Sequence, residues 1–225
     1  RRVRMVTILR EPLSRDLSYY NHRVDENLQR RNWTLEWYNT SLVPVQKFCV
    51  LPTVLPGGRP RPPTYEDEIR CEIDRWNACL DAAGSGKSPT EQYEHCVSRG
   101  HYRGSIVRGI YAMHLARWKR FFSRSQILVL QYEEIHKDLP GHVERIGRFW
   151  GLPLPRVDAM AESNAHEGRH KLRRIDCRTR ARLVALFQPW NKLLYQDLRR
   201  DHVAGAVPEQ EPRHFRVFDG AVKCT

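Results

Sequence analysis

The sequence predicts an α/β fold, with a mainly parallel sheet and helices on both of its faces. Two short segments rich in β-branched and aliphatic residues, 3–9 and 126–132, read as strands, and helical patterns lie between and after them. Strands that alternate with helices form parallel sheets with helical cover. The chain has 225 residues, 40% of them hydrophobic, which suffices for a core of ordinary globular type.

The first strand leads directly into a helix. Residues 3–9 end at Arg10-Glu11-Pro12, and proline suits the first turn of a helix, where its missing N–H is not needed. The helix is predicted from about residue 12 to 31. Its apolar side chains recur at three- and four-residue steps, namely Leu13, Leu17, Tyr20, Val24 and Leu28.

A proline-rich loop and a second helix follow. Residues 42–63 contain six prolines and Gly57-Gly58, which excludes regular structure over most of the stretch and predicts a long surface loop. Thr64 with Asp67 resembles a capping box, so a helix is predicted from Thr64 until Gly84.

Gly84-Ser85-Gly86-Lys87-Ser88 resembles the end of a phosphate-binding P-loop. The earlier glycine of that motif would fall at Asp81, however, and a helix rather than a strand precedes the segment. We interpret it as a flexible connection between helices.

Helices and a strand alternate again in the second half of the chain. A third helix is predicted over residues 105–122 and a buried strand over 126–132. A short helix begins at Asp138 and stops at Gly151, and the last long helix spans 178–200 with Pro189 as a kink.

Arginine dominates the charge of the protein. Lys and Arg together number 38 against 26 acidic residues, a net charge of +12. The arginine fork matches phosphate, sulfate and carboxylate oxygens, so we expect a polyanionic partner. Charge alone does not choose between nucleic acid and an acidic polysaccharide, although no nucleic-acid-binding signature is recognisable.

Two features indicate a secretory compartment. Asn32 and Asn39 each begin an N-glycosylation sequon, and six cysteines permit up to three disulfides. No apolar run approaches the roughly 18 residues needed to span a bilayer. The chain opens on Arg1 rather than Met, so we expect a piece of a longer protein, whose membrane anchor would lie upstream.

The cysteines and histidines do not predict a metal site. Cys71, Cys79, Cys96, His95 and His101 could in principle bind zinc, but no CxxC pair exists and the spacings are irregular. Disulfide bonding is the expectation, with the pairing open.

The first strand–helix junction is the best candidate for anion binding. A strand that points at a helix N-terminus directs free N–H groups and the positive end of the helix dipole toward a bound anion. Arg10 lies at the end of the strand, and Ser18 follows on the second turn of the helix. A guanidinium fork and a hydroxyl could therefore converge on one phosphate, although an arginine in this position can also be an ordinary surface residue.

Residues 10–22 resemble the 3′-phosphate-binding segment of the sulfotransferases that use 3′-phosphoadenosine 5′-phosphosulfate (PAPS). The resemblance extends over about 200 residues in the same order. Its later segments, which resemble the Golgi glycosaminoglycan sulfotransferases, are 109–118, 121–122, 126–130, 149–152 and 187–195. The most similar subgroup is the N-acetylgalactosamine 4-sulfate 6-O-sulfotransferases, with the heparan sulfate sulfotransferases next. The resemblance implies a P-loop-like sulfotransferase fold.

The resemblance also implies roles for single residues. Arg10 and Ser18 would bind the 3′-phosphate of PAPS, and His22 matches a histidine near the acceptor. Gly168 and Arg169 match a loop that closes over the nucleotide. Glu167 stands where the family usually has lysine, so Lys171 or Arg173 could serve instead.

A disulfide between Cys79 and Cys96 is implied in the same way, with Cys71 as a competitor and Cys49 and Cys224 as further partners.

The family's 5′-phosphosulfate loop does not occur in this chain. The family's order places that loop before Arg1, so we expect a sulfotransferase domain over residues 1–200 truncated at its N-terminus, with a tail over 201–225.

The implied activity is sulfuryl transfer from PAPS to a hydroxyl of an acidic glycan, such as a glycosaminoglycan. It implies a location in the Golgi lumen, as a type II membrane protein or a secreted form, with no metal and no nucleic acid. The alternative is an inactive module that binds an anionic glycan.

Overall fold

The computed structural model describes residues 3–29, 49, 53–54, 60–61, 64–98, 105–154, 174–203 and 223–224. The chain forms two compact units. Unit 1 comprises residues 1–11, 110–165 and 188–219, and unit 2 comprises residues 12–109, 166–187 and 220–225.

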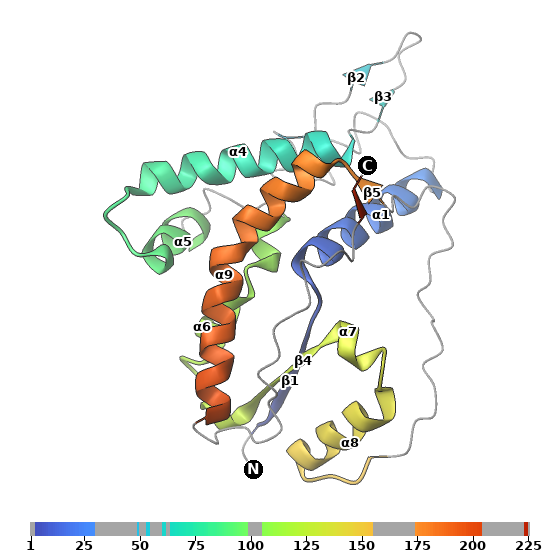
Figure 1. Cartoon of the computed structure of the whole chain (residues 1–225), viewed down its shortest axis with the longest axis vertical. Helices are drawn as coiled ribbons and strands as arrows, with labels where there is room; N and C mark the ends of the chain where they lie inside the picture. The colour runs from blue at the N-terminus through green and yellow to red at the C-terminus, as the bar shows by residue number, and fades with distance from the viewer. Residues whose placement is uncertain are drawn as a thin grey trace. The chain divides into compact units, whose positions relative to one another are not determined.

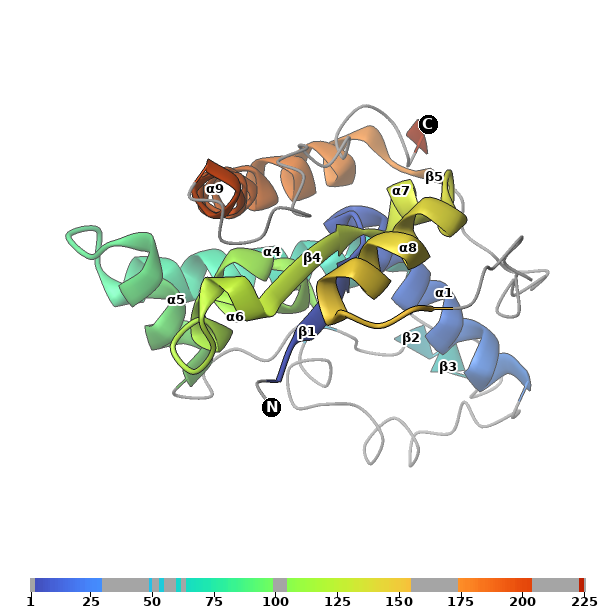
Figure 2. The ribbon, with the colours of Figure 1, turned by 90° about the horizontal axis from the view of Figure 1, so that it is seen from below.

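A parallel pair of strands forms the centre of unit 1. Strand β1 (Met5–Leu9) lies beside β4 (Ile127–Gln131), and their register runs from Met5 opposite Ile127 to Leu9 opposite Gln131. Figures 1 and 2 show the two strands side by side. The predicted strands and their parallel arrangement are confirmed.

Helices cover both faces of β4, because its alternate side chains enter two different hydrophobic clusters. Ile127 and Val129 pack with residues of helix α6 (Tyr111–Trp118) and of the C-terminal part of α9 (Cys177–Val203). Leu128 and Leu130 pack with Ile135 and Phe149 from α7 (Tyr132–Ile135) and α8 (Leu139–Trp150). A strand buried on both faces explains the continuous apolar run in the sequence, and the predicted α/β class is confirmed.

Local signals fix the ends of α8. The Asp138 side chain accepts a hydrogen bond from Gly141 N at 2.9 Å, which caps the helix N-terminus. Gly151 ends the helix in the left-handed conformation, with φ 69°. The predicted start and stop of this helix are therefore confirmed.

A cluster of four charged side chains links α9 to the segment between α6 and β4 in unit 1. Lys119 Nζ lies 2.5 Å from a carboxylate oxygen of both Asp197 and Asp201 on α9. Arg124, in the short 3-10 helix η2 (Arg124–Gln126), pairs with the same two carboxylates. Asp201 is 3% exposed, so this cluster is partly buried and holds α9 beside the segment that leads into β4.

Unit 2 is mainly helical. In the described residues, its helices include α1 (Pro12–Gln29), α4 (Tyr65–Ala83), α5 (Pro89–Ser98), the 3-10 helix η1 (Ile106–Gly109) and the first part of α9. Two small strand pairs complete it: β2 (Thr53–Val54) with β3 (Pro60–Arg61), antiparallel, and β5 (Arg174–Ile175) with β6 (Lys223–Cys224), parallel. Within the predicted loop 42–63, the described residues thus include one short hairpin.

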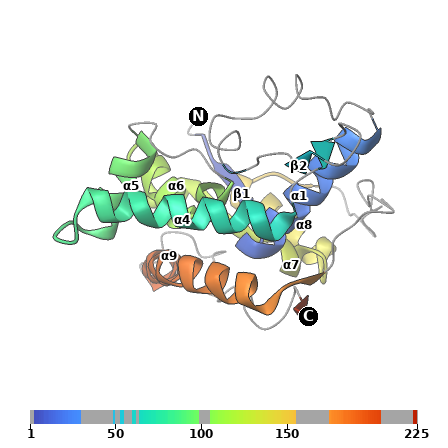
Figure 3. The same cartoon turned by 90° about the horizontal axis from the view of Figure 1, so that it is seen from above.

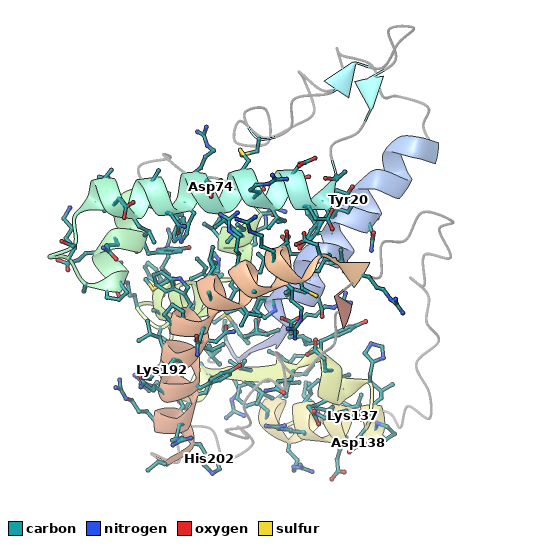
Figure 4. The ribbon with its side chains drawn as sticks, turned by 45° about the horizontal axis from the view of Figure 1, so that its top comes forward. Tyr20, Asp74, Lys137, Asp138, Lys192 and His202 are labelled. Carbon is teal, nitrogen blue, oxygen red and sulfur yellow. A yellow bond between two sulfur atoms is a disulfide. The ribbon has the colours of Figure 1, made fainter. Side chains whose placement is uncertain are left out.

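Helices α4 and α5 follow one another through residues 84–88 (Figure 3). The Thr64 side chain accepts a hydrogen bond from Asp67 N at 3.2 Å, and Gly84 closes α4 with φ 95°. The glycine-rich segment is the helix connection that the sequence predicts. Ring contacts add to the packing: Tyr20 of α1, which is labelled in Figure 4, meets Tyr65 of α4 edge to face, at 5.2 Å between centroids.

The predicted helix over 105–122 is wrong at both ends, since α6 spans only Tyr111–Trp118. Residues 106–109 form η1, and α6 begins only at Tyr111. A Cβ at Gly109 would lie 2.8 Å from the Phe187 ring and 3.1 Å from the Pro12 Cβ. Close packing at this glycine therefore favours the break.

The last helix is longer than predicted, running from Cys177 to Val203 with Pro189 inside it. The division between the two units falls between Phe187 and Gln188, one residue before this proline. No helix in the described part of the chain is long and apolar enough to cross a membrane.

Candidate functional site

The carboxyl ends of β1 and β4 form the candidate site of unit 1. Ligands of open parallel sheets bind at this edge, where each strand is followed by a loop or a helix. Arg10 directly follows β1, and Tyr132 directly follows β4. The register of the strands places these two residues next to one another at the same edge.

Arg10 is held by two tyrosines. Its carbonyl oxygen accepts a hydrogen bond from the Tyr111 hydroxyl at 2.8 Å, and its guanidinium carbon lies 5.0 Å from the centre of the Tyr132 ring. Stacking on the ring holds the guanidinium while its N–H edges stay available to an anion. Within the described part of the chain, Arg10 forms no ion pair with a carboxylate, so its charge can serve a bound phosphate.

One backbone donor at this edge is already occupied. Glu11 N donates to Glu133 Oε1 at 2.8 Å, although the sequence suggests free N–H groups at the strand–helix junction. The bond ties the residue after β1's end to the first turn of α7. That backbone donor is therefore not available to an anion at this edge.

A largely apolar cavity of about 370 Å³ lies beside β1 in unit 1. Thr7, Leu9, Tyr111, His114 and Trp118 are among its lining residues. Apolar walls offer few donors for a phosphate, so this cavity does not compete with the edge at Arg10. Tyr111 packs in the hydrophobic core of unit 1.

Ser18 and His22 lie on α1, which begins at Pro12 and belongs to unit 2. Ser18 is half-buried and His22 is exposed. Residues four apart share one helix face, so the hydroxyl and the imidazole project from the same side of α1. Arg10 belongs to unit 1, whereas Ser18 and His22 belong to unit 2.

Tyr19 forms a second arginine–tyrosine stack. The guanidinium carbon of Arg108, in η1, lies 5.0 Å from the centre of the Tyr19 ring. The sequence gives no sign of this pair, because the two residues are far apart along the chain. It places an exposed cation beside the helix that carries Ser18 and His22.

The start of η1 is anchored to a buried glutamate. Glu72 Oε2 accepts hydrogen bonds from Ser105 Oγ at 3.1 Å and from Ile106 N at 3.2 Å. Burial, together with the nearby charges of Asp16 and Glu68, raises the pKa of Glu72 to about 8. At neutral pH, Glu72 therefore holds a proton more readily than an ordinary glutamate.

Asp16 and Arg15 complete this network. Asp16 Oδ2 accepts a hydrogen bond from the Tyr65 hydroxyl at 3.1 Å, and burial raises the pKa of that tyrosine. Arg15 Nη2 donates to Asp16 Oδ1 at 3.2 Å and to the Ser105 carbonyl at 2.9 Å. Reasoning from the sequence missed these residues; their contacts join α1, α4 and η1, and only the tertiary structure brings them together.

The remaining predicted site residues lie outside the described residues. They are Gly168, Arg169 and Lys171 of the nucleotide loop, and Asn32 and Asn39 of the sequons. Their roles stay predictions.

The cysteines of unit 2 form disulfides. Cys79 bonds to Cys96, the pair that the resemblance implies, and Cys49 bonds to Cys71. Cys177 is disulfide-bonded as well. Among the described residues, no group of three or more His, Cys, Asp or Glu side chains could hold a metal ion.

Comparison with known proteins gives the family. A family model described as a sulfotransferase domain matches residues 1–173. Sulfotransferase 2B1 of Homo sapiens is 35% identical over 68 residues, which cover 30% of this chain and 18% of that protein. The chain thus matches less than a fifth of the length of this relative. With more than three quarters of its residues matched by the family model, the chain belongs to the sulfotransferase domain family.

Proposed function

We propose that this protein transfers a sulfuryl group from PAPS to a hydroxyl of an acidic glycan, such as a glycosaminoglycan. Membership of the sulfotransferase family supports sulfuryl transfer. The single observation that carries the donor assignment is Arg10, a guanidinium stacked on Tyr132 at the carboxyl end of a parallel sheet. A planar cation in this setting fits a phosphate group.

The residues of this chain would bind the donor nucleotide and the acceptor as follows. Arg10 and Ser18 would donate hydrogen bonds to the 3′-phosphate of the nucleotide, and Gly168, Arg169 and Lys171 would close over it. Bound PAPS supplies the sulfuryl group, which passes to the acceptor oxygen as its bond to the 5′-phosphate breaks. His22 would stand on the acceptor side, where a base can receive the hydroxyl proton.

An acidic glycan is the acceptor class that fits the charge. The protein carries a net charge of +12 with 38 basic residues, and repeated sulfate or carboxylate groups would meet repeated arginines in charge-assisted hydrogen bonds. The disulfides of unit 2 support an oxidising compartment. We therefore propose the Golgi lumen as its location.

The nucleotide site can be tested by calorimetry with 3′-phosphoadenosine 5′-phosphate (PAP), the product nucleotide, and the full-length protein. Arg10→Ala should weaken PAP binding by about 10- to 100-fold, since it removes a charge-assisted hydrogen bond. Arg117→Ala removes the same charge from an exposed position on α6 and should leave the affinity unchanged.

Equal affinity of wild type and Arg10→Ala would refute the role of Arg10. Binding of glycan with no binding of PAP would instead favour the inactive glycan-binding module.

A further inference from the structure

Arg108 is an exposed cation held in a fixed place in unit 2. Its guanidinium lies over the Tyr19 ring, with 5.0 Å between the guanidinium carbon and the ring centre. Within the described part of the chain, Arg108 forms no ion pair with a carboxylate. Its positive charge is therefore not neutralised by those residues.

The segment that carries Arg108 is itself tightly held. Its flanking residues in η1, Val107 and Gly109, are buried. At the start of the turn, the Glu72 carboxylate receives hydrogen bonds from Ser105 and from the backbone of Ile106. A long side chain that is already ordered loses little conformational entropy when it binds a ligand.

Stacking leaves the donors of Arg108 at the edge of the guanidinium plane. The contact with the Tyr19 ring, at 5.0 Å from the guanidinium carbon to the ring centre, takes up none of the five N–H groups in a conventional hydrogen bond. The same construction occurs at Arg10 over Tyr132 in unit 1. This construction suits the recognition of a planar carboxylate or of a sulfate.

The position of Tyr19 on α1 indicates which ligand would supply the anion. His22 lies three residues after Tyr19, so both project from one side of the helix. His22 is the residue assigned to the acceptor side, whereas Arg10 already provides a stacked guanidinium for the nucleotide. Ser18, assigned to the nucleotide, directly precedes Tyr19 on the same helix, so Arg108 is assigned to the acceptor because Arg10 already provides the guanidinium for the nucleotide.

We propose that Arg108, stacked on Tyr19, binds a sulfate or carboxylate group of the acidic glycan acceptor. The inference rests on the proposed function for the identity of the acceptor. It adds a specific subsite to the general attraction between a basic protein and a polyanion.

The test measures binding of a heparin oligosaccharide of defined length and, separately, binding of PAP. Three variants of the full-length protein are compared with wild type: Arg108→Ala, Arg108→Lys and the exposed-arginine control Arg117→Ala. We expect Arg108→Ala to weaken heparin binding by about 10-fold or more and to leave PAP binding unchanged. Arg108→Lys should recover only part of the loss, because lysine keeps the charge but lacks the planar fork.

An equal effect of Arg108→Ala and Arg117→Ala on heparin binding would overturn the subsite, since it would show a general charge effect. A loss of PAP binding with unchanged heparin binding would overturn it too, because the anion would then be the nucleotide's phosphate. Failure of the proposed function itself looks different: the wild-type protein would bind no PAP, whatever the state of Arg108.

Discussion

The buried glutamate of unit 2 predicts a pH-dependent stability. Glu72 is 0% exposed, and its pKa is raised from 4.5 to about 8 by burial and by Asp16 and Glu68. In the unfolded chain the same group ionises near its ordinary pKa. Between these two values the folded protein holds a proton that the unfolded chain has released, so the stability falls as the pH rises. The stability that the protonated Glu72 contributes to the folded protein is fully present below about pH 4.5 and is lost as the pH rises through 8.

The size of the effect follows from the shift. Each pKa unit corresponds to about 1.4 kcal/mol, so a shift from 4.5 to about 8 sets an upper limit of roughly 5 kcal/mol. Burial is the largest cause of this shift, and the nearby charges of Asp16 and Glu68 add to it, so only part of the limit is assigned to burial itself. We therefore expect a loss of about 2 to 5 kcal/mol in the free energy of unfolding over this range.

Glu72→Gln is the informative variant. Its amide oxygen can still accept the hydrogen bonds from Ser105 and Ile106, and its NH₂ group mimics the protonated acid. Urea unfolding followed by circular dichroism from pH 5 to 8.5 should show a flatter pH profile for Glu72→Gln than for wild type. The control Glu144→Gln changes an exposed glutamate on α8 that pairs with Arg148, and its profile should run parallel to that of wild type. Parallel profiles for wild type and Glu72→Gln would refute the reasoning.

Three further changes test the packing of the two units. Asp201→Asn removes a buried carboxylate from the charged cluster of unit 1 and should lower the free energy of unfolding by about 3 kcal/mol; no change in the urea midpoint would show that the cluster does not stabilise the unit. Cys79→Ser opens the disulfide to Cys96, 17 residues away, and should cost roughly 3 kcal/mol; a thermal scan identical to that of wild type would contradict this. Gly109→Ala would force a Cβ to within 2.8 Å of the Phe187 ring and should cost about 1 to 3 kcal/mol, whereas an unchanged melting temperature would show that the ring moves aside freely.

The sequence predicts those elements whose signals are local. The strand at 126–132 is a continuous apolar run because both of its faces are buried, and α4 and α8 carry visible caps at Thr64 and Asp138. The bounds of helix α5, which follows the predicted connection at residues 84–88, are not among the predictions, although a local signal marks its start. Ser88 and Glu91 exchange side-chain hydrogen bonds at its start, which is the capping-box pattern.

The rest depends on contacts between distant residues. The break between η1 and α6 lies where Gly109 packs closely against Phe187. The local sequence of residues 105–122 does not predict this break. In the same way, Arg108 meets Tyr19 only because η1 packs beside α1. Arg10 could be identified from its place between a strand and a proline, but its stacking on Tyr132 depends on the pairing of β1 with β4.

The central claim is sulfuryl transfer to an acidic glycan, and it is tested most directly by incubating the full-length protein with PAPS carrying radiolabelled sulfate and a panel of glycosaminoglycans. The account predicts that label enters at least one acidic glycan and that Arg10→Ala abolishes this transfer while Arg117→Ala preserves it. The absence of label in every glycan, together with no binding of PAP by the wild-type protein, would contradict the account.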